Sequence, residues 1–181
     1  MSKNSFNNRI IRATMLDSNL YEEVEADKSA LGQAMAIVVF SSIAAGIGLY
    51  KTGGFSGIIT GTMASLISWY VWAYLTYFIG TKFFPEPQTQ ADLGELLRTI
   101  GFSSSPGLLR VFYFVPGIGV LLYLISSFWM LVAMIIAVRQ ALDYNSTLRA
   151  VGVCVIGYII QIFVFVLLFS IFGGTLPEAT P

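Results

Sequence analysis

The sequence contains no histidine and a single cysteine, Cys154, which lies inside an apolar run. A lone cysteine excludes an internal disulfide framework and a thiolate metal cluster. Without histidine or a second cysteine, neither a catalytic triad nor a metal cage can be assembled. We therefore expect no catalytic residue, no metal site and no bound cofactor.

Charged side chains are also scarce. They make up 11% of the 181 residues, whereas soluble domains carry about 25%. Hydrophobic residues make up 56%, more than a water-soluble fold can cover, so the expected solvent is lipid. The formal net charge is zero, which argues against nucleic acid as a partner. Residues 1–30 are polar, so we expect no cleavable signal peptide.

Five apolar segments dominate the rest of the chain. They are Leu31–Tyr50, Phe55–Ile79, Leu96–Val115, Ile118–Val138 and Leu148–Phe172. Each reaches the roughly 20 residues needed to cross a hydrocarbon core about 30 Å thick. Because backbone polar groups cannot be left unpaired in lipid, the segments should be α-helices. The sequence predicts an all-α membrane domain of five helices at residues 31–172, between a cytoplasmic segment at 1–30 and a short tail at 173–181.

The N-terminal segment carries an amphipathic pattern at residues 8–30. Its apolar positions fall three or four residues apart: Ile10, Ala13, Leu16, Leu20 and Val24. This spacing predicts one amphipathic helix lying at the membrane face. Its first half is basic, through Arg9 and Arg12, and its second half is acidic. Two uses remain open: packing on the bundle as a solvated helix, or docking to lipid headgroups or a partner.

The third apolar segment is interrupted in its middle by Pro106-Gly107. Proline lacks the backbone N–H that a continuous helix needs there, so we predict a crossing helix that is kinked at Pro106. Arg110 lies near the turn at Pro116, from which its long side chain can reach the outer face. The alternative is a re-entrant hairpin, which would leave four true spans.

Basic residues near the span ends set the expected orientation. With five spans, six lie on the side of the N-terminus, namely Arg12, Lys28, Lys82, Arg98, Arg139 and Arg149, and two on the other, Lys51 and Arg110. The N-terminus is therefore expected in the cytoplasm and the C-terminus outside. A re-entrant third segment would return the C-terminus to the cytoplasm.

The second predicted span carries a stripe of small residues and two deep tryptophans. Gly57, Gly61 and Ser65 recur every four positions, a spacing that lets helices approach closely. We expect these residues to pack within the bundle, with dimerisation as the alternative. Trp69 and Trp72 belong by default to the aromatic belt at the membrane interface, and a face that contacts lipid or pigment is the other interpretation.

The interrupted third segment holds the candidate ligand site. Ser103, Ser104, Ser105 and the carbonyls freed at Pro106 could coordinate a solute, as the broken helices of transporters do. Arg110 is the most interior charged residue. Serines beside a proline more often satisfy the freed backbone groups themselves, so both interpretations stay open.

Charged residues also gather near the loops on the expected cytoplasmic side. They are Asp92, Glu95, Arg98, Arg139 and Asp143. We treat them as a candidate surface for a cytoplasmic partner, and a charge cluster that anchors the loops is the alternative. Thr89, three residues before Asp92, is a candidate N-cap of the third helix.

The order of these features resembles a known family. The segments that carry the resemblance are Asn19–Asp27, Asp92–Arg98 before Ser105-Pro106-Gly107, Pro116–Gly119, Trp129, Ala137–Asp143 and Arg149-Ala150. Together they are similar to bacterial members of the Yip family, polytopic membrane proteins named for interaction with Ypt/Rab GTPases. The resemblance extends over residues 10–172.

The resemblance implies five membrane helices with a cytoplasmic N-terminus and an outer C-terminus, in a bacterial cytoplasmic membrane. Eukaryotic relatives are linked to vesicle trafficking through a long N-terminal region implicated in GTPase contact. This chain lacks that region's motif, so GTPase binding is doubtful. We expect a non-enzymatic protein that scaffolds or organises membrane proteins or lipids, with a membrane-protein partner or a second copy of the chain. A small transporter or channel around the broken third helix is the alternative.

Overall fold

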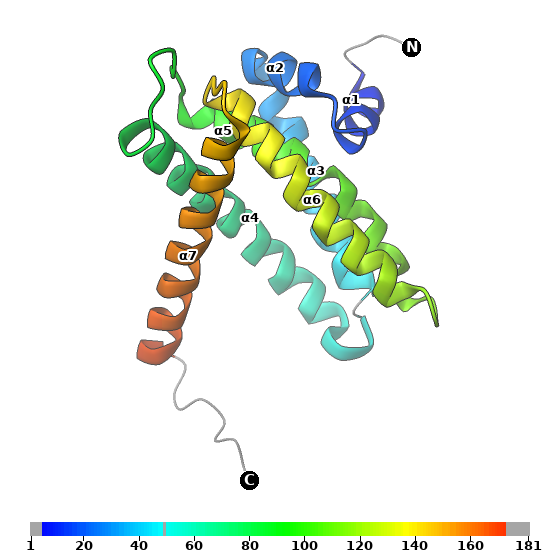
Figure 1. Cartoon of the computed structure of the whole chain (residues 1–181). Coiled ribbons are helices and arrows are strands. Elements are labelled where there is room, and N and C mark those ends of the chain that lie inside the picture. The colour runs from blue at the N-terminus through cyan, green and yellow to red at the C-terminus, as the bar shows by residue number, and fades with distance from the viewer. Residues whose placement is uncertain (1–4, 49, 173–181) are drawn as a thin grey trace.

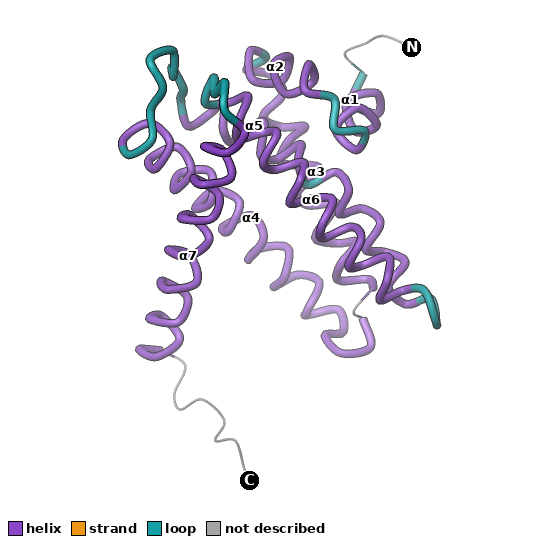
Figure 2. The backbone as a smooth tube through the Cα atoms, in the orientation of Figure 1, coloured by secondary structure: helices purple, strands orange, loops and turns teal. Residues whose placement is uncertain are grey.

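The computed structural model describes residues 5–48 and 50–172, which form helices joined by loops, without a strand (Figure 2). This confirms the predicted all-α class. In chain order the helices are α1 (Phe6–Thr14), α2 (Ser18–Ala26), the 3-10 helix η1 (Lys28–Ala30), α3 (Leu31–Gly48), α4 (Tyr50–Lys82), α5 (Leu93–Ser103), the 3-10 helix η2 (Ser105–Phe114), α6 (Gly119–Ala141) and α7 (Thr147–Phe172). The predicted tail at 173–181 lies outside the described residues.

The single amphipathic helix predicted at residues 8–30 is wrong, because this segment forms α1, α2 and η1. The chain turns at Leu16, whose φ of 61° is left-handed. Asp17 then caps α2 by accepting a hydrogen bond from the Asn19 amide at 3.0 Å. Such a cap starts a new helix, and this local signal overrides the continuous apolar spacing.

The apolar face of this N-terminal segment points into the protein. Ala13, Leu20 and Val24 are fully buried, and α2 packs on α5 and α6. The sequence left two roles open for the amphipathic N-terminal segment, and the structure shows the first of them, packing on the helix bundle.

Four helices are long and apolar enough to cross a membrane. Within the described residues they are Lys28–Gly48, Gly53–Lys82, Gly119–Ala141 and Thr147–Val164. Each overlaps one predicted span, so the first, second, fourth and fifth apolar segments are confirmed as candidate membrane helices. α4 leaves helical geometry at Gly54, where φ is 58°, and its candidate span begins at this break.

The third predicted span is built differently. Its α-helix ends at Ser103, and the chain continues beyond Ser104 as the 3-10 helix η2. The prediction of one α-helix that kinks at Pro106 and runs on is therefore corrected: Pro106 has no N–H to donate, and the tighter helix takes over around it. Figure 1 shows α4 ending and α6 beginning at opposite ends of the molecule, so the α5–η2 segment runs between these ends.

α5 begins with a capping box. The Asp92 side chain accepts a hydrogen bond from the Glu95 amide at 2.8 Å, and the Glu95 side chain accepts one from the Asp92 amide at 2.8 Å. The N-cap is thus Asp92 rather than Thr89, whose hydroxyl oxygen accepts a hydrogen bond from the Glu86 amide. The reciprocal pair satisfies two amides that a helix start would otherwise leave free.

Helices α3, η2 and α6 lie side by side, with α5 above η2 and the α1–α2 pair at one end (Figure 1). Glycines allow the backbones to approach. A Cβ on Gly48 would lie 2.5 Å from the Arg110 carbonyl oxygen, and a Cβ on Gly101 would lie 2.7 Å from the Ala34 Cβ. We call α1, α2, α3, α5, η2 and α6 together the closed half.

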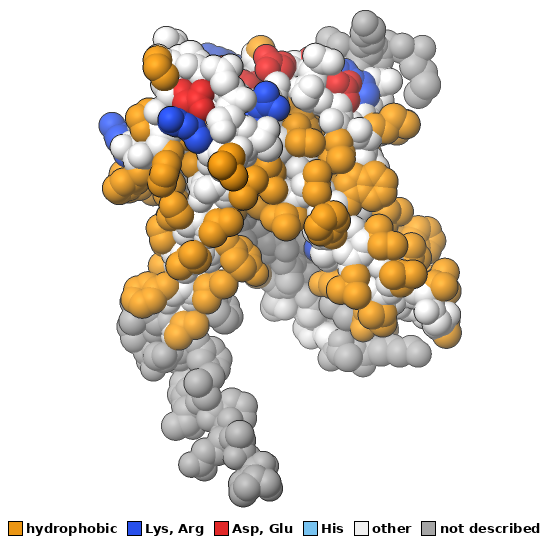
Figure 3. Space-filling view, viewed as in Figure 1, with side chains coloured by type: hydrophobic (Ala, Val, Ile, Leu, Met, Phe, Trp, Pro, Cys, Tyr) orange, Lys and Arg blue, Asp and Glu red, His pale blue; other side chains and the backbone are white. Residues whose placement is uncertain are grey.

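Helices α4 and α7 diverge from the closed half (Figure 1). α4 contacts α3 and α5, and α7 contacts α4 and α6. In Figure 3, the charged side chains gather at the end that carries α1, α2 and the loops, while hydrophobic side chains cover the remaining length. The same view shows a hollow between α7 and the closed half.

Candidate binding groove in the membrane domain

A groove of about 1090 Å³ separates the closed half from the α4–α7 pair. Helices α3, α4, α5, η2, α6 and α7 all contribute to its walls. Ligand sites in proteins commonly measure about 300–1,000 Å³, so the groove is large enough for a sizeable ligand. Its lining is mostly aliphatic, small or hydroxyl-bearing.

The small-residue stripe of α4 forms one wall of the groove. Gly57, Gly61 and Ser65 all line it. A Cβ placed on Gly57 or Gly61 would meet no atom of another helix within 4 Å. The predicted packing of these two glycines inside the bundle is therefore corrected: α4 approaches α3 through Ile58, which lies 3.0 Å from a Cβ on Gly46, and the glycines face open space.

The two tryptophans of α4 face the interior of the protein. Trp69 and Trp72 line the groove and are only 9% and 7% exposed. Trp69 donates a hydrogen bond from Nε1 to the Leu97 carbonyl at 3.1 Å. Trp72 makes an edge contact with Tyr158 of α7, and its Nε1 has no hydrogen-bond partner among the described residues. The interfacial belt, the default interpretation, does not describe these buried rings.

The serines of the broken segment bond their own backbone. Ser103 and Ser105 donate to the carbonyls of Ile100 and Phe102, each at 2.7 Å. The Pro106 carbonyl accepts a hydrogen bond from the Ser126 hydroxyl, also at 2.7 Å. These bonds satisfy the groups that the end of the α-helix frees, which is the simpler of the two predicted roles. Ser103 and its neighbour Ser104 still present atoms to the groove.

Arg110 lies on η2 and lines the groove. Its guanidinium sits 5.1 Å from the centroid of the Tyr123 ring, and its Nη2 donates to the Ser127 hydroxyl at 3.1 Å. Both partners belong to α6. A cation over an aromatic face is stabilised when it is withdrawn from water. These contacts hold the side chain along α6, and its reach toward the outer face stays a prediction.

Among the described residues that line the groove, Arg110 is the only charged one. Its Nε is buried and has no hydrogen-bond partner among the described residues. A cation withdrawn from water is costly unless an anion or further acceptors compensate it. One tyrosine ring and one hydroxyl compensate this charge only in part, so an anion would be favoured at this point of the groove.

The predicted cytoplasmic partner surface is divided by the fold. Asp92 and Glu95 form the capping box of α5, whereas Arg98 is 5% exposed and turns toward α2. Its Nε donates to the Val24 carbonyl at 2.9 Å, and its guanidinium also bonds the Glu25 carbonyl. Arg98 therefore serves the end of α2 instead of standing ready for a partner.

The remaining two residues of that surface hold loops. Arg139 donates from Nε to the Tyr144 carbonyl at 3.2 Å, and the Asp143 carboxylate accepts from the Gln90 amide at 3.2 Å. The Asp143 contact joins the loop after α4 to the loop after α6. These bonds agree with the loop-anchoring alternative, and a role of this surface toward a partner stays a prediction.

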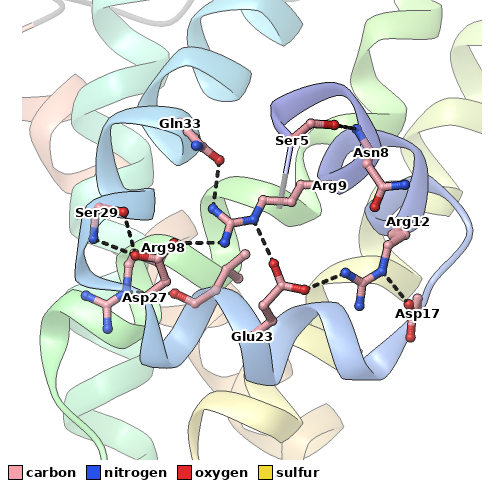
Figure 4. Close-up of polar contacts among 11 residues, drawn as sticks. Ser5, Asn8, Arg9, Arg12, Asp17, Glu23, Asp27, Ser29, Gln33 and Arg98 are labelled. Carbon is pink, nitrogen blue, oxygen red and sulfur yellow. Dashed lines mark hydrogen bonds and ion pairs between the residues drawn. The ribbon is translucent and has the colours of Figure 1, made fainter. Parts of the chain in front are cut away.

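Sequence reasoning missed the most extensive polar cluster, which lies at the α1–α2–α3 junction (Figure 4). Arg9 is 2% exposed and bonds Glu23 at 2.9 Å, Asp27 at 2.8 Å and Gln33 at 3.0 Å. Arg12 bonds Asp17 at 2.7 Å and Glu23 at 2.5 Å. The signal was present: a basic first half and an acidic second half pair when the segment folds back on itself.

An acidic cluster lies beside this network. Burial, together with the nearby carboxylates of Asp143, Glu95 and Glu22, raises the pKa of Glu25 to about 8 against the lowering effect of Arg98. Glu22 accepts a hydrogen bond from the Gln140 side chain at 2.6 Å. Glu25 thus retains its proton at a pH where Glu23, bonded by two arginines, has lost its own. Within the described residues, no group of three metal-ligating side chains occurs.

Helical architecture, membrane-length helices and a charged α1–α2 end set the context for comparison with known proteins. A family model, described as the Yip1 domain, matches residues 18–169, which is most of the chain. This chain belongs to the Yip family. The predicted resemblance is thereby confirmed, and the Yip protein is a multi-pass integral membrane protein. No curated protein and no solved structure matched it.

The Yip match begins at α2 and ends within α7. It therefore includes every helix that lines the groove. Members of the Yip family are generally non-enzymatic membrane proteins, in keeping with a groove whose lining suits binding.

Proposed function

We propose that this Yip protein organises its membrane by holding another membrane component, a lipid or a helix of a partner, in the groove beside α4. The observation that carries the proposal is the open glycine wall at Gly57 and Gly61, where the chain places no helix of its own. Small residues on a membrane helix permit close approach by a neighbour, and here the space for that neighbour is empty.

The chemistry of the lining supports binding without a reaction. In the part of the chain that the structure describes, Arg110 is the only charged side chain that lines the groove, and Cys154 is buried beside aliphatic neighbours. The hydroxyl groups of Ser103 and Ser127 are engaged with backbone carbonyls. We therefore assign no enzymatic activity to this protein.

The proposed topology has five crossings, with α5 and η2 together forming the third. The opposite positions of the end of α4 and the start of α6 support it, because the chain between them must pass from one face to the other (Figure 1). The N-terminus is then cytoplasmic and the C-terminus outside, in a bacterial cytoplasmic membrane, with domain boundaries at 30/31 and 172/173. Reporter fusions after Pro87 and after Gly117 test this: the first should report the cytoplasm and the second the outside. Two cytoplasmic reporters would restore the re-entrant alternative.

Native extraction tests the proposed function. The protein is released from its membrane in polymer-bounded lipid particles, purified, and analysed by mass spectrometry for bound lipids and proteins. The wild type should retain a component that the Gly61→Leu variant loses, because the added side chain occupies the groove without meeting another helix of the chain. Ala64→Leu is the matched control, since Ala64 is exposed on the same helix but does not line the groove.

A wild-type protein that is strictly monomeric, with no partner and no retained lipid, would contradict the proposal. Equal retention by Gly61→Leu and the wild type would place the bound component elsewhere on the molecule and would count equally against the groove.

A further inference from the structure

The groove has two chemically different ends. Arg110 lies level with the end of α3, because a Cβ on Gly48 would lie 2.5 Å from the Arg110 carbonyl oxygen. This end is opposite the charged end that carries α1 and α2 (Figures 1 and 3). The other end of the groove is closed by aromatic and aliphatic side chains, including Trp69, Trp72 and Ile100. A single cation therefore marks one end of a long apolar channel.

The groove is long enough to hold an acyl chain, which reaches across about half of a bilayer's hydrocarbon core. Along α4 the lining extends from Gly53 to Trp72, roughly 28 Å at the rise of an α-helix. The hydrocarbon core of a bilayer is about 30 Å thick. An occupant that fills the groove is thus apolar over most of its length and charged or polar near Arg110.

Two polar groups at the groove lack a partner among the described residues, and the charged one points to an anionic ligand. The Arg110 Nε has no acceptor among the described residues, and the same holds for Nε1 of Trp72, a side chain only 7% exposed. Leaving buried donors unpaired is unfavourable, and an unpaired cation in this setting is more so. The lining residues that the structure describes include no carboxylate that could pair with Arg110.

One anion is abundant in membranes at the level of the headgroups, where this end of the groove would lie. It is the phosphate of a phospholipid. An acidic side chain on a partner helix could also pair with arginine, but carboxylates within membrane helices are expensive and rare. Arginine binds phosphate through charge-assisted hydrogen bonds from several of its N–H groups. The observed lining therefore fits a lipid better than a helix.

We propose that the groove binds one anionic glycerophospholipid, with its phosphate on Arg110 and an acyl chain along the glycine wall of α4 toward Trp72. The lipid comes from the leaflet opposite the α1–α2 end. This assignment rests on the proposed function, of which it names the bound component. Gly57 and Gly61 are small in order to make room for the chain, and the Arg110–Tyr123 contact holds the cation at the groove entrance.

The test is a lipid titration of the purified, delipidated protein, followed by native mass spectrometry. Phosphatidylglycerol is the probe, diacylglycerol with the same acyl chains is the probe without phosphate, and inorganic phosphate is the probe without chains. We expect phosphatidylglycerol to bind the wild type at least about tenfold more tightly than diacylglycerol, since only the phosphate forms charge-assisted hydrogen bonds with Arg110. Inorganic phosphate alone should not compete at millimolar concentration.

Three variants locate the binding. Arg110→Gln should weaken phosphatidylglycerol binding about tenfold or more, whereas Arg110→Lys, which keeps the charge, should retain most of it. Lys82→Gln removes an exposed cation at the other end of α4 and should change nothing. Gly61→Leu should weaken phosphatidylglycerol and diacylglycerol alike, because it fills the channel and leaves the cation in place.

The outcomes separate this inference from the proposed function. Equal binding of phosphatidylglycerol by Arg110→Gln and the wild type would overturn the phosphate assignment, and competition by inorganic phosphate would overturn the assignment to a lipid. If native particles of the wild type hold a protein that Gly61→Leu releases while Arg110→Gln keeps it, the proposed function stands and the lipid assignment fails. If neither lipid nor protein is retained, both fail.

Discussion

The closed half and the groove use the same residue types in opposite ways. Gly48 is so crowded that a methyl group would meet the Arg110 backbone, whereas Gly57 has no neighbour within 4 Å of its missing Cβ. Arg9 is enclosed by acceptors, whereas the Arg110 Nε has none among the described residues. The contrast teaches that the closed half uses glycine and arginine for contacts within the chain, whereas at the groove the described residues leave Gly57 and the Arg110 Nε without such contacts.

The arginines should give a clear contrast in stability. Arg9→Gln removes one partner from a buried network and leaves Glu23 and Asp27 partly buried without it; because these carboxylates keep some access to solvent, we expect a loss of about 2 kcal/mol in the free energy of unfolding. Arg110→Gln should stay within about 1 kcal/mol of the wild type, since it removes a poorly compensated cation. Thermal unfolding in detergent measures the stability of both variants. Equal losses in the free energy of unfolding would contradict the distinction between the two regions.

The glycines provide a second pair. Gly48→Ala should cost about 1–3 kcal/mol, because the new methyl group overpacks the contact between α3 and η2. Gly57→Ala should be neutral or stabilise the protein by up to about 1 kcal/mol, since alanine favours a helix and meets no atom here. Chemical denaturation of the two variants beside the wild type gives the comparison. Destabilisation by Gly57→Ala would mean that the groove is closed in the folded protein.

The tryptophans isolate the value of one hydrogen bond. Trp69→Phe loses the bond from Nε1 to the Leu97 carbonyl and should cost about 1 kcal/mol more than Trp72→Phe. Trp72→Phe removes a donor without a described partner and keeps an aromatic ring beside Tyr158. Both substitutions delete the same atoms, so the difference between their unfolding free energies reports the bond. In lipid-free protein, a greater cost for Trp72→Phe would reverse the assignment.

The smallest expected effect is a difference in pH dependence between two glutamates of α2. Because the pKa of Glu25 is raised to about 8, its protonated form favours the fold at low pH, and this contribution is lost as the pH rises through about 8. The Glu25→Gln variant should therefore have a higher unfolding temperature than the wild type above pH 8 and the same unfolding temperature at pH 4.

Glu23 should behave in the opposite sense. Burial alone would raise its pKa, but the hydrogen bonds from Arg12 and Arg9 outweigh this and lower it. Its contribution is present above the ordinary pKa of a glutamate and is lost as the pH falls through the lowered value. Unfolding temperatures between pH 3 and pH 9 should show acid sensitivity that Glu23→Gln reduces, and identical profiles for the two variants would contradict both assignments.

Hydropathy was enough to predict four of the candidate membrane helices, because apolar length is a property of the sequence alone. The break at Leu16 was not predictable from apolar spacing, since the spacing continues across it. A leucine in the sequence also does not indicate a positive φ. The change to a 3-10 helix after Ser104 was foreseen only as a disturbance at Pro106. A proline in the sequence shows that a backbone donor is missing, but it does not determine which type of helix replaces the α-helix.

The candidate site was harder to predict for a related reason. A stripe such as Gly57, Gly61 and Ser65 is compatible with a packed neighbour or with an open wall, and only the direction of α4 relative to α3 decides between them. Arg98 and Arg110 were both chosen as site residues from their charge. The fold buries the first against α2 and turns the second into the groove, and neither outcome follows from spacing along the chain.

The bond from Arg98 to the end of α2 has a consequence for the order of events during synthesis. α2 ends at Ala26 without a glycine, and the Val24 and Glu25 carbonyls near its end accept hydrogen bonds from Arg98, more than 70 residues later in the chain. The free carbonyls of a helix end need such a partner when they are buried. The end of α2 is therefore finished only after the third apolar segment, which is synthesised later, has arrived.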